Sequence, residues 1–410
     1  MLGSARGLNS NCVDQRTSLV GLPAAGVGLL SALAMLLDFS PVGIAALVLL
    51  SQLVREHPSK AMAVWGAVYV PVTALWTVPA LSGPIAMLGA IAGYALCGVI
   101  FYGGSSVLAS RVLCRYPILI LGCSLGLAEA TSAALALVMA PIGLFAVQGF
   151  LGSLIAGFSV VGASVIIGVV VSIAGVFLRN LALPMTMALV YLLCLIPGPH
   201  LPSYDGPPVH GISHSPDAEL KWTSHAHAAD NFSRLQSLSE AVAGNGLIVW
   251  PEGAVTETFS LKKAVSKLEP DHLPLLFGMT RYANTRAPDL RNSAVLVTKN
   301  GVQVTDKKRL VPFYEGAVPF LFETDLEPGT RRVLVLPDGT KILPLICYEV
   351  FMPRTWFLKR LDADLILVMS AETGFPRGVS ASIMKRHVRA RELETGVRVV
   401  WVSDRSSETD

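Results

Sequence analysis

The first 200 residues of the chain contain very little charge. They hold seven Lys or Arg residues and four acidic residues, whereas residues 201–410 hold 25 of each sign. Because soluble domains are about one-quarter charged, the first half has the composition of a membrane domain and the second half that of a soluble domain. The formal net charge of +3 lies entirely in the first half. Without a basic patch in the second half, the sequence predicts no nucleic-acid partner.

Cysteine is scarce in the second half, which contains only Cys347. This thiol has no disulfide partner there, and no Cys-x-x-Cys or Cys/His spacing indicates zinc. His225 and His227 do not share a helix face because they are two residues apart, and we expect them in an exposed loop. The sequence therefore predicts neither a metal nor a cofactor. Position alone leaves open whether Cys347 is a buried inert residue or a reactive thiol.

The apolar first half divides into seven candidate membrane segments, near 22–37, 41–54, 61–81, 84–102, 117–139, 150–177 and 181–197. A spanning helix needs about 20 residues, so the first two segments are short. Lys and Arg fall in alternate loops, which by the positive-inside rule face the cytoplasm. We therefore expect a multi-pass protein of the bacterial inner membrane, with a cytoplasmic N-terminus and the second half on the periplasmic side.

The sequence predicts four sections: a cytoplasmic N-terminal segment (1–20), a membrane domain (21–197), a linker rich in Pro and Gly (198–218) and a catalytic domain (219–410). In the catalytic domain, short apolar runs bounded by turn residues alternate with helical patterns, which is typical of an α/β fold. Strands are expected near 247–250, 275–278, 294–298, 332–336, 341–346, 365–369 and 397–402, and helices near 230–243 and 380–395.

Three stretches of the second half carry candidate chemistry. An apolar run ends in Cys347 and Glu349, a second ends in Glu252, and a basic cluster contains Lys307 and Lys308. Reactive groups at strand ends lie where α/β folds place their chemistry. A lysine would favour the thiolate and stabilise an oxyanion, while Glu252 would exchange protons. Glu349 would lie on the same side as Cys347 if the strand continued, and the residues alone do not choose between the two lysines.

The stretches Trp250-Pro251-Glu252, Asp306 to Glu315 and Cys347-Tyr348-Glu349 resemble motifs of the nitrilase (carbon-nitrogen hydrolase) superfamily, whose triad is Glu, Lys and Cys. The whole chain resembles the apolipoprotein N-acyltransferase family, and Arg291-Asn292-Ser293 is a weaker match. The resemblance implies an α-helical membrane domain followed by a nitrilase-like αββα sandwich. It implies a catalytic triad of Glu252, Lys307 and Cys347, because the family lysine precedes Leu-Val-Pro-Phe by three positions. It also implies supporting roles for Glu315, Tyr348 and Glu349.

The resemblance implies an acyltransferase that forms a thioester from a membrane phospholipid and passes the acyl group to the amine of a lipoprotein or another acceptor. Three features depart from the family pattern, and the length resembles that of the shorter plasmid conjugal-transfer proteins of the TraB branch. Tyr314 replaces a family Gly, residues 370–375 replace Asn-Asp-Ala-Trp-Phe-Gly, and the sequence ends at Asp410 before the closing strands and last membrane helix expected from the family. Conjugation machinery is therefore a further expected partner. The alternative function is an idle or non-lipid amidase-like component of a conjugation or envelope complex.

Overall fold

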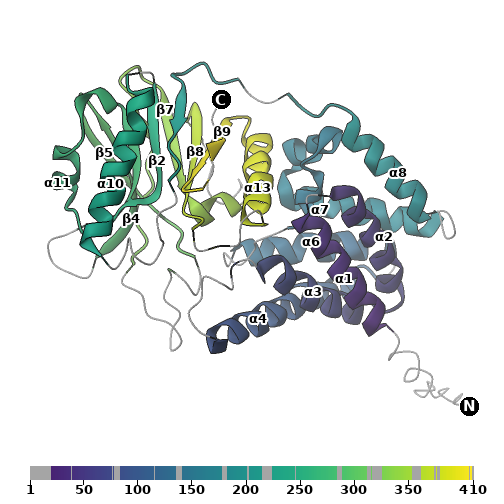
Figure 1. Ribbon diagram of the computed structural model, residues 1–410. Helices are drawn as coiled ribbons and strands as arrows, with labels where there is room; N and C mark the ends of the chain where they lie inside the picture. The colour runs from purple at the N-terminus through teal and green to yellow at the C-terminus, as the bar shows by residue number, and fades with distance from the viewer. Residues whose placement is uncertain are drawn as a thin grey trace, which may run out of the picture.

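The computed structural model describes residues 20–37, 39–75, 77, 84–114, 116–134, 141–177, 182–200, 203–214, 224–244, 246–283, 289–311, 315, 326–352, 362–373, 375, 379–405 and 407–408. A bundle of apolar helices lies beside a two-sheet domain, and helix α13 (Val379–Thr395) lies between them (Figure 1). The predicted N-terminal segment, apart from Val20, falls outside the described residues, as does Tyr314.

The first half is helical, with elements α1 (Gly21–Leu36), α2 (Ser40–Glu56), α3 (Pro58–Ala74), α4 (Pro84–Gly98), η3 (Val99–Gly103), α5 (Gly104–Val112), α6 (Pro117–Ala134), η4 (Ile142–Ala146), η5 (Gly149–Leu151), α7 (Gly152–Phe177) and α8 (Ala182–Leu195). The π-helical turn η3 joins α4 to α5. Within the described residues, a helix lies in each of the seven predicted segments. In α2 and α3 a proline occupies the first turn, where its missing N–H costs nothing.

Only part of this bundle satisfies the length and composition of a membrane span. Among the described residues, the helices at Met87–Val112 and Gly152–Val176 are long and apolar enough to cross a bilayer. Gly21–Leu36 and Ile118–Thr131 are shorter apolar helices. The prediction that these segments are helical is confirmed, and the prediction that they span a membrane about seven times stays a prediction.

A buried carboxylate organises the middle of the bundle. Glu129 on α6 accepts a hydrogen bond from the N–H of Ile142 at 2.7 Å and another from the hydroxyl of Ser164. The Ser164 hydroxyl oxygen in turn accepts the N–H of Gly143 at 2.6 Å. These bonds satisfy the first N–H groups of η4, which has no earlier turn to bond to. The segment at 142–146 is thereby held inside the bundle against α7.

The second half folds into two five-stranded sheets. The first has the order β1 (Val209–Gly211), β2 (Leu247–Val255), β3 (Leu275–Tyr282), β4 (Leu290–Thr298), β5 (Gly301–Asp306), and the second the order β10 (Ser407–Glu408), β9 (Arg398–Ser403), β8 (Leu365–Ser370), β7 (Lys341–Ile346), β6 (Leu334–Val335). Strands β1 to β3 are parallel in the first sheet and β7 to β9 in the second.

Helices cover the outer faces of both sheets. One apolar core lies between the sheets, a second lies between the first sheet and α10 (His225–Ser239) with α11 (Leu261–Ser266), and a third lies between the second sheet and α13. Short helical turns η6 (Glu240–Val242), η7 (Pro270–His272) and η8 (Cys347–Phe351) connect these elements. The predicted nitrilase-like αββα sandwich is confirmed, and Figure 1 shows α10 and α13 on its opposite sides.

Several element boundaries differ from those expected. Strand β1 lies within the predicted linker 198–218, so the sheet begins before residue 219. Helix α10 begins earlier than expected because Ser224 caps it by accepting the N–H of His227. His225 and His227 therefore lie in the first turn of a helix rather than in a loop. Strand β5, which precedes Lys307, was not predicted.

Helix α13 bonds directly to the helical bundle. Ser159 has φ of 66° and breaks α7, and Glu394 of α13 accepts the N–H of the next residue, Val160, at 2.7 Å. Glu394 also forms an ion pair with Arg391 at 2.7 Å, with side-chain exposures of 0% and 1%. A carboxylate at a helix N-terminus satisfies a free N–H and favours the helix dipole. The α/β domain thus supplies the cap for the second part of α7.

A second contact of α13 reaches deeper into the bundle. Arg386, which is 2% exposed, donates to the carbonyl of Leu144 at 3.0 Å and to the hydroxyl of Ser40 at 3.4 Å. Its guanidinium also lies 5.9 Å from the ring centroid of Phe145, within range of a cation–π interaction. Two buried charged residues, Arg386 and Glu394, therefore fix the orientation of the two domains.

Replacing Glu394 by Ala tests this interface. The substitution leaves Arg391 buried without its carboxylate and uncaps Val160, and breaking a buried ion pair costs about 3–5 kcal/mol. We expect a lower thermal unfolding midpoint in detergent and faster proteolysis between the two domains. Glu240→Ala, at an exposed glutamate, is the matched control. Equal stability of the two variants would contradict the interface.

Candidate active site

Glu252 lies on β2 at a bulge that redirects its side chain. Trp250 packs against the outer helices, and regular alternation would place Glu252 on that same face. The pairing of β2 with β3 instead shifts register between Trp250 and Val255, and Gly253 within this stretch has φ of 62°. The irregularity turns Glu252 toward the space between the sheets, where it meets Asn292 of β4.

The neighbouring strand leaves room for this bulge. A Cβ atom on Gly278 of β3 would lie 2.5 Å from the Cα of Glu252 and 2.5 Å from the carbonyl oxygen of Pro251. Both obstacles are backbone, which does not move aside for a side chain. Glycine at 278 is therefore required for β2 and β3 to approach each other at the functional glutamate.

Lys307 enters the same space from the end of β5. Its N–H donates to the carbonyl of Asn292 at 2.7 Å, which continues the β4–β5 ladder beyond Asp306. Lys307 is 1% exposed, whereas the next residue, Lys308, is exposed. The structure therefore brings Lys307, and not Lys308, to Glu252.

Cys347 follows β7 in a left-handed conformation. On β7, Leu343 and Leu345 face α13 while Ile346 faces the other sheet, so alternation would direct Cys347 toward α13. Instead Cys347 has φ of 51°, and its side chain packs against the core between the sheets. A non-glycine residue in this region costs about 1–3 kcal/mol. That strain accompanies a thiol turned toward the space that Glu252 and Lys307 share.

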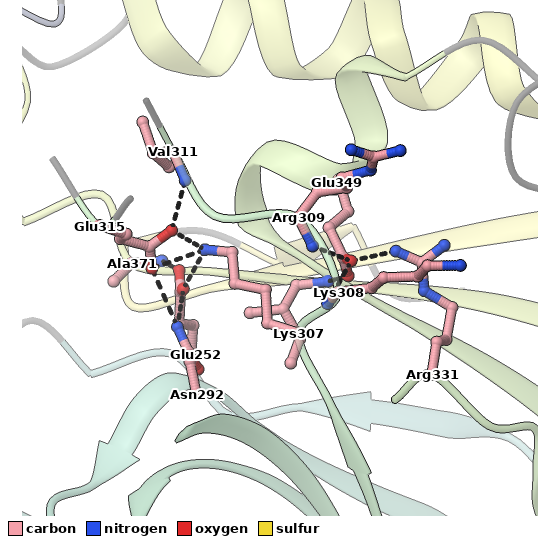
Figure 2. A network of polar contacts seen from close by, with 11 residues as sticks. Glu252, Asn292, Lys307, Lys308, Arg309, Val311, Glu315, Arg331, Glu349 and Ala371 are labelled. Atoms are coloured by element: carbon pink, nitrogen blue, oxygen red, sulfur yellow. Dashed lines mark hydrogen bonds and ion pairs between the residues drawn. The ribbon is translucent and has the colours of Figure 1, made fainter. Parts of the chain in front are cut away.

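A buried ammonium lies between two carboxylates in this space (Figure 2). Nζ of Lys307 is 3.1 Å from Oε1 of Glu252 and 2.8 Å from Oε1 of Glu315. Glu252 and Glu315 are 8% and 6% exposed. Removing three charged groups from water is costly unless they are paired and hydrogen-bonded. Two carboxylates and one ammonium leave this cluster with one excess negative charge.

Three donors of the cluster were not predicted as site residues. Nδ2 of Asn292 lies 2.7 Å from Oε1 of Glu252, and the N–H of Ala371 donates to Oε2 of Glu252 at 3.0 Å. The N–H of Val311 donates to Oε2 of Glu315 at 2.9 Å. Asn292 belongs to the Arg-Asn-Ser match noted in the sequence, which was the only signal for it. The other two donors are backbone N–H groups, so the residue types at these positions do not indicate them.

The charges of the cluster act on the thiol. Burial raises the pKa of Cys347 well above its ordinary value of 9.0, and the negative charge of Glu252 and its hydrogen bond with the thiol raise it further. Lys307 opposes this effect. Burial lowers the pKa of Lys307, but Glu252 and Glu315 outweigh burial, so the pKa of Lys307 lies above its ordinary value. The resting site therefore holds a neutral thiol beside a charged lysine.

Glu349 lies beyond the end of β7, because the chain turns at Cys347 into η8. Its Oε2 accepts the N–H of Ile346 at 3.0 Å. Its Oε1 accepts the N–H of Lys308 at 2.9 Å and also the guanidinium of Arg331 (Figure 2). Because the strand does not continue, the condition for placing Glu349 beside Cys347 on a strand is not met. Glu349 instead ties the turn that carries the thiol to the loop that carries Lys307.

Tyr348 lies away from the charged cluster. Its side chain is 1% exposed and belongs to the core that faces α13. Its ring packs edge to face with Phe351 at 5.5 Å between centroids, and burial raises the pKa of Tyr348. Tyr348 therefore packs η8 against the second sheet. Within the described residues, no group of three His, Cys, Asp or Glu side chains is arranged to hold a metal ion.

Residues 220–405 match the family model described as carbon-nitrogen hydrolase. The apolipoprotein N-acyltransferase of Rhizobium rhizogenes is 30% identical over 227 residues, 47% of this chain and 42% of the relative. That of Agrobacterium fabrum is 32% identical over 203 residues, 42% and 38% of the two chains. The chain thus spans less than half the length of these relatives. A carbon-nitrogen hydrolase structure from Helicobacter pylori G27 is 15% identical over 48% of this chain and 72% of its own, with a TM-score of 0.34.

The pH dependence of alkylation tests the electrostatics of the thiol. We expect the reaction of Cys347 with iodoacetamide to reach half its maximal rate above pH 9, because a raised thiol pKa leaves little thiolate at neutral pH. Glu252→Gln removes a negative charge and should lower this midpoint, whereas Lys307→Met should raise it. Mass spectrometry of the Cys347 peptide gives the rate, with exposed Cys114 as the internal reference. Identical midpoints in the two variants would contradict the assignment.

Proposed function

The α/β domain belongs to the carbon-nitrogen hydrolase family of the nitrilase superfamily, and from this premise we propose that the chain is a membrane-bound acyltransferase with Cys347 as its nucleophile. One observation carries the proposal. The strained Cys347 interacts electrostatically with a cluster in which Lys307 is bonded to Glu252 and Glu315. A thiol, a carboxylate base and a fixed ammonium are the parts that acyl transfer requires.

The first half-reaction would form a thioester. Glu252 takes the thiol proton as the sulfur of Cys347 bonds to the carbonyl carbon of an ester. Lys307 stabilises the oxyanion of the tetrahedral intermediate. The carbon–oxygen bond of the ester then breaks, and the proton held by Glu252 passes to the leaving alcohol. Cys347 loses one proton and the leaving alcohol gains one, so Glu252 returns to its carboxylate form.

The second half-reaction would move the acyl group to nitrogen. An amine attacks the thioester carbon and passes a proton to Glu252. The carbon–sulfur bond then breaks to release an amide, and Glu252 returns the proton to the sulfur of Cys347. Two relatives are named apolipoprotein N-acyltransferase, which supports a lipoprotein amine as the acceptor. Transfer to water would make the same site a hydrolase, namely an esterase with an ester donor or an amidase with an amide donor. A role with conjugation machinery stays a prediction.

The exposed apolar side chains support a lipid environment and a phospholipid donor. Among the large apolar residues that the structure exposes, all but Tyr282, Val302 and Val335 belong to the helical half. They include Leu88, which is 68% exposed, and Phe158, which is 61% exposed. A surface of this kind marks contact with a membrane or a partner. The apolar helices make lipid the occupant that we propose.

An idle membrane component is the alternative. A catalytically idle component would gain nothing from a cysteine at a positive φ, because this strained backbone conformation lowers stability. It would also have no use for a lysine buried between two glutamates, because buried ion pairs are seldom net stabilising. Both features reduce stability and both surround Cys347. We therefore favour the enzyme.

Trapping the acyl-enzyme tests the first half-reaction. Purified protein in detergent, incubated with phospholipid carrying a labelled acyl chain, should acquire a hydroxylamine-sensitive label on Cys347. Glu252→Gln and Lys307→Met should reduce labelling by about 100-fold or more, and Cys347→Ala should abolish it. Cys97→Ser, at another partly buried thiol, should label like the wild type. Absence of label on folded wild-type protein would contradict a lipid-derived thioester.

The orientation of the chain in the membrane has a separate test. Cys114 is exposed and follows α5 in a loop expected to be cytoplasmic. A membrane-impermeant maleimide should therefore label Cys114 in inverted membrane vesicles and spare it in right-side-out vesicles. A cysteine introduced by Ser266→Cys, at an exposed position of α11, should show the opposite pattern. Labelling of both residues from the same side would overturn the proposed orientation.

A further inference from the structure

Asn292 lies between the two carboxylates of the cluster. Its Nδ2 is 2.7 Å from Oε1 of Glu252 and 3.2 Å from Oε1 of Glu315. Lys307 bonds to the same two oxygen atoms. The amide and the ammonium therefore bridge the same pair of glutamates, as Figure 2 shows. Asn292 is 7% exposed, so water does not easily replace it.

The neighbours determine how the amide is oriented. The NH₂ group donates hydrogen bonds and the amide oxygen only accepts them. A flipped amide would set Oδ1 against two carboxylate oxygens, which is repulsive. The observed orientation leaves Oδ1 buried without a hydrogen bond from any described residue. A buried acceptor without a partner lowers stability, so the side chain is not explained by stability alone.

We propose that Asn292 is a positioning residue that holds Glu252 and Glu315 in fixed relation to Lys307 and offsets, through its N–H dipoles, part of the effect of their excess charge on Cys347. The role in turnover rests on the proposed acyltransferase function. Its two N–H groups, aimed at two different glutamates, fix the distance between carboxylates that would otherwise repel each other. Lys307 alone could not do this, since its flexible stem and three rotatable donors impose little geometry. The amide of Asn292 is planar and is carried by strand β4, so it constrains the positions of the two carboxylates more strongly than Lys307 does.

The proposal predicts the effect of losing the amide. Without the dipoles of its N–H groups, less of the electrostatic effect of the two carboxylates on Cys347 is offset. Negative charge from Glu252 and Glu315 raises the pKa of Cys347, so the thiol should lose its proton only at higher pH. Acylation should therefore slow at neutral pH while binding of the donor changes little.

Asn292→Leu provides the main test, because leucine has nearly the size of asparagine and no donor. At pH 7, thioester formation should fall about tenfold or more, with less than about a twofold change in the donor concentration for half-maximal rate. The midpoint of Cys347 alkylation by iodoacetamide should rise by about half a pH unit or more. Asn292→Gln retains a donor, so its midpoint should lie between those of the wild type and the leucine variant.

Asn231→Leu is the matched control. Asn231 is also buried, its Nδ2 donates to the carbonyl of Ala254 on β2 at 2.8 Å, and its Oδ1 likewise has no hydrogen bond from a described residue. The control should lose thermal stability without moving the alkylation midpoint. An equal shift in Asn231→Leu, no shift in Asn292→Leu, or a glutamine variant as impaired as leucine would overturn the proposal. So would loss of folding in both Asn292 variants but not in Asn231→Leu.

The two readouts separate this inference from the function on which it rests. Alkylation of Cys347 needs no substrate and reports only the thiol and its neighbours. If wild-type protein forms no thioester with phospholipid, the proposed donor is wrong, and the alkylation midpoints still decide the role of Asn292. If wild-type protein forms the thioester and the midpoints coincide, the function stands and Asn292 has no positioning role.

Discussion

A lysine buried between two glutamates is the interaction on which the rest of the site depends. Lys307 is 1% exposed, and a lone buried ammonium would give up its proton rather than stay charged. The carboxylates of Glu252 and Glu315 keep it charged. Because two carboxylates face one ammonium, one negative charge is left unbalanced. That charge, together with burial, keeps the nearby thiol protonated. In the proposed reaction, the thiol would therefore lose its proton only as its sulfur attacks a bound carbonyl carbon.

The fold brings these groups together through irregular backbone at two strands. Glu252 and Cys347 would both face outer helices if their strands alternated regularly. A bulge at Gly253 redirects the first, and a left-handed residue at the end of β7 redirects the second. Lys307 needs no such device, because it continues the inward-facing positions of β5. The two irregular backbones therefore lie at the two residues assigned to proton transfer and nucleophilic attack.

The sequence predicted best those elements that depend on the pattern of apolar residues within a short stretch. Apolar runs correctly predicted the positions of β2, β3, β7, β8 and β9, because buried parallel strands are continuously apolar. Strand β5 was missed because only Val302 and Val304 mark its apolar face. The choice of Lys307 over Lys308 came from the resemblance, since alternation is undefined without β5. Asn292 had only the weak Arg-Asn-Ser match as a signal, and the N–H of Ala371 had none, because a backbone donor does not depend on side-chain identity.

The position of α13 relates the site to the helical half. Strand β8 ends next to Ala371, whose N–H fixes Glu252, and α13 follows within the next few residues. At its far end, Glu394 caps the broken helix α7. One strand–helix unit thus contacts Glu252 at one point and the apolar bundle at another. Because both contacts are made by buried charged groups, a rotation between the domains would break one of them. The site is consequently held at a fixed orientation to the bundle, as a substrate presented by that bundle would require.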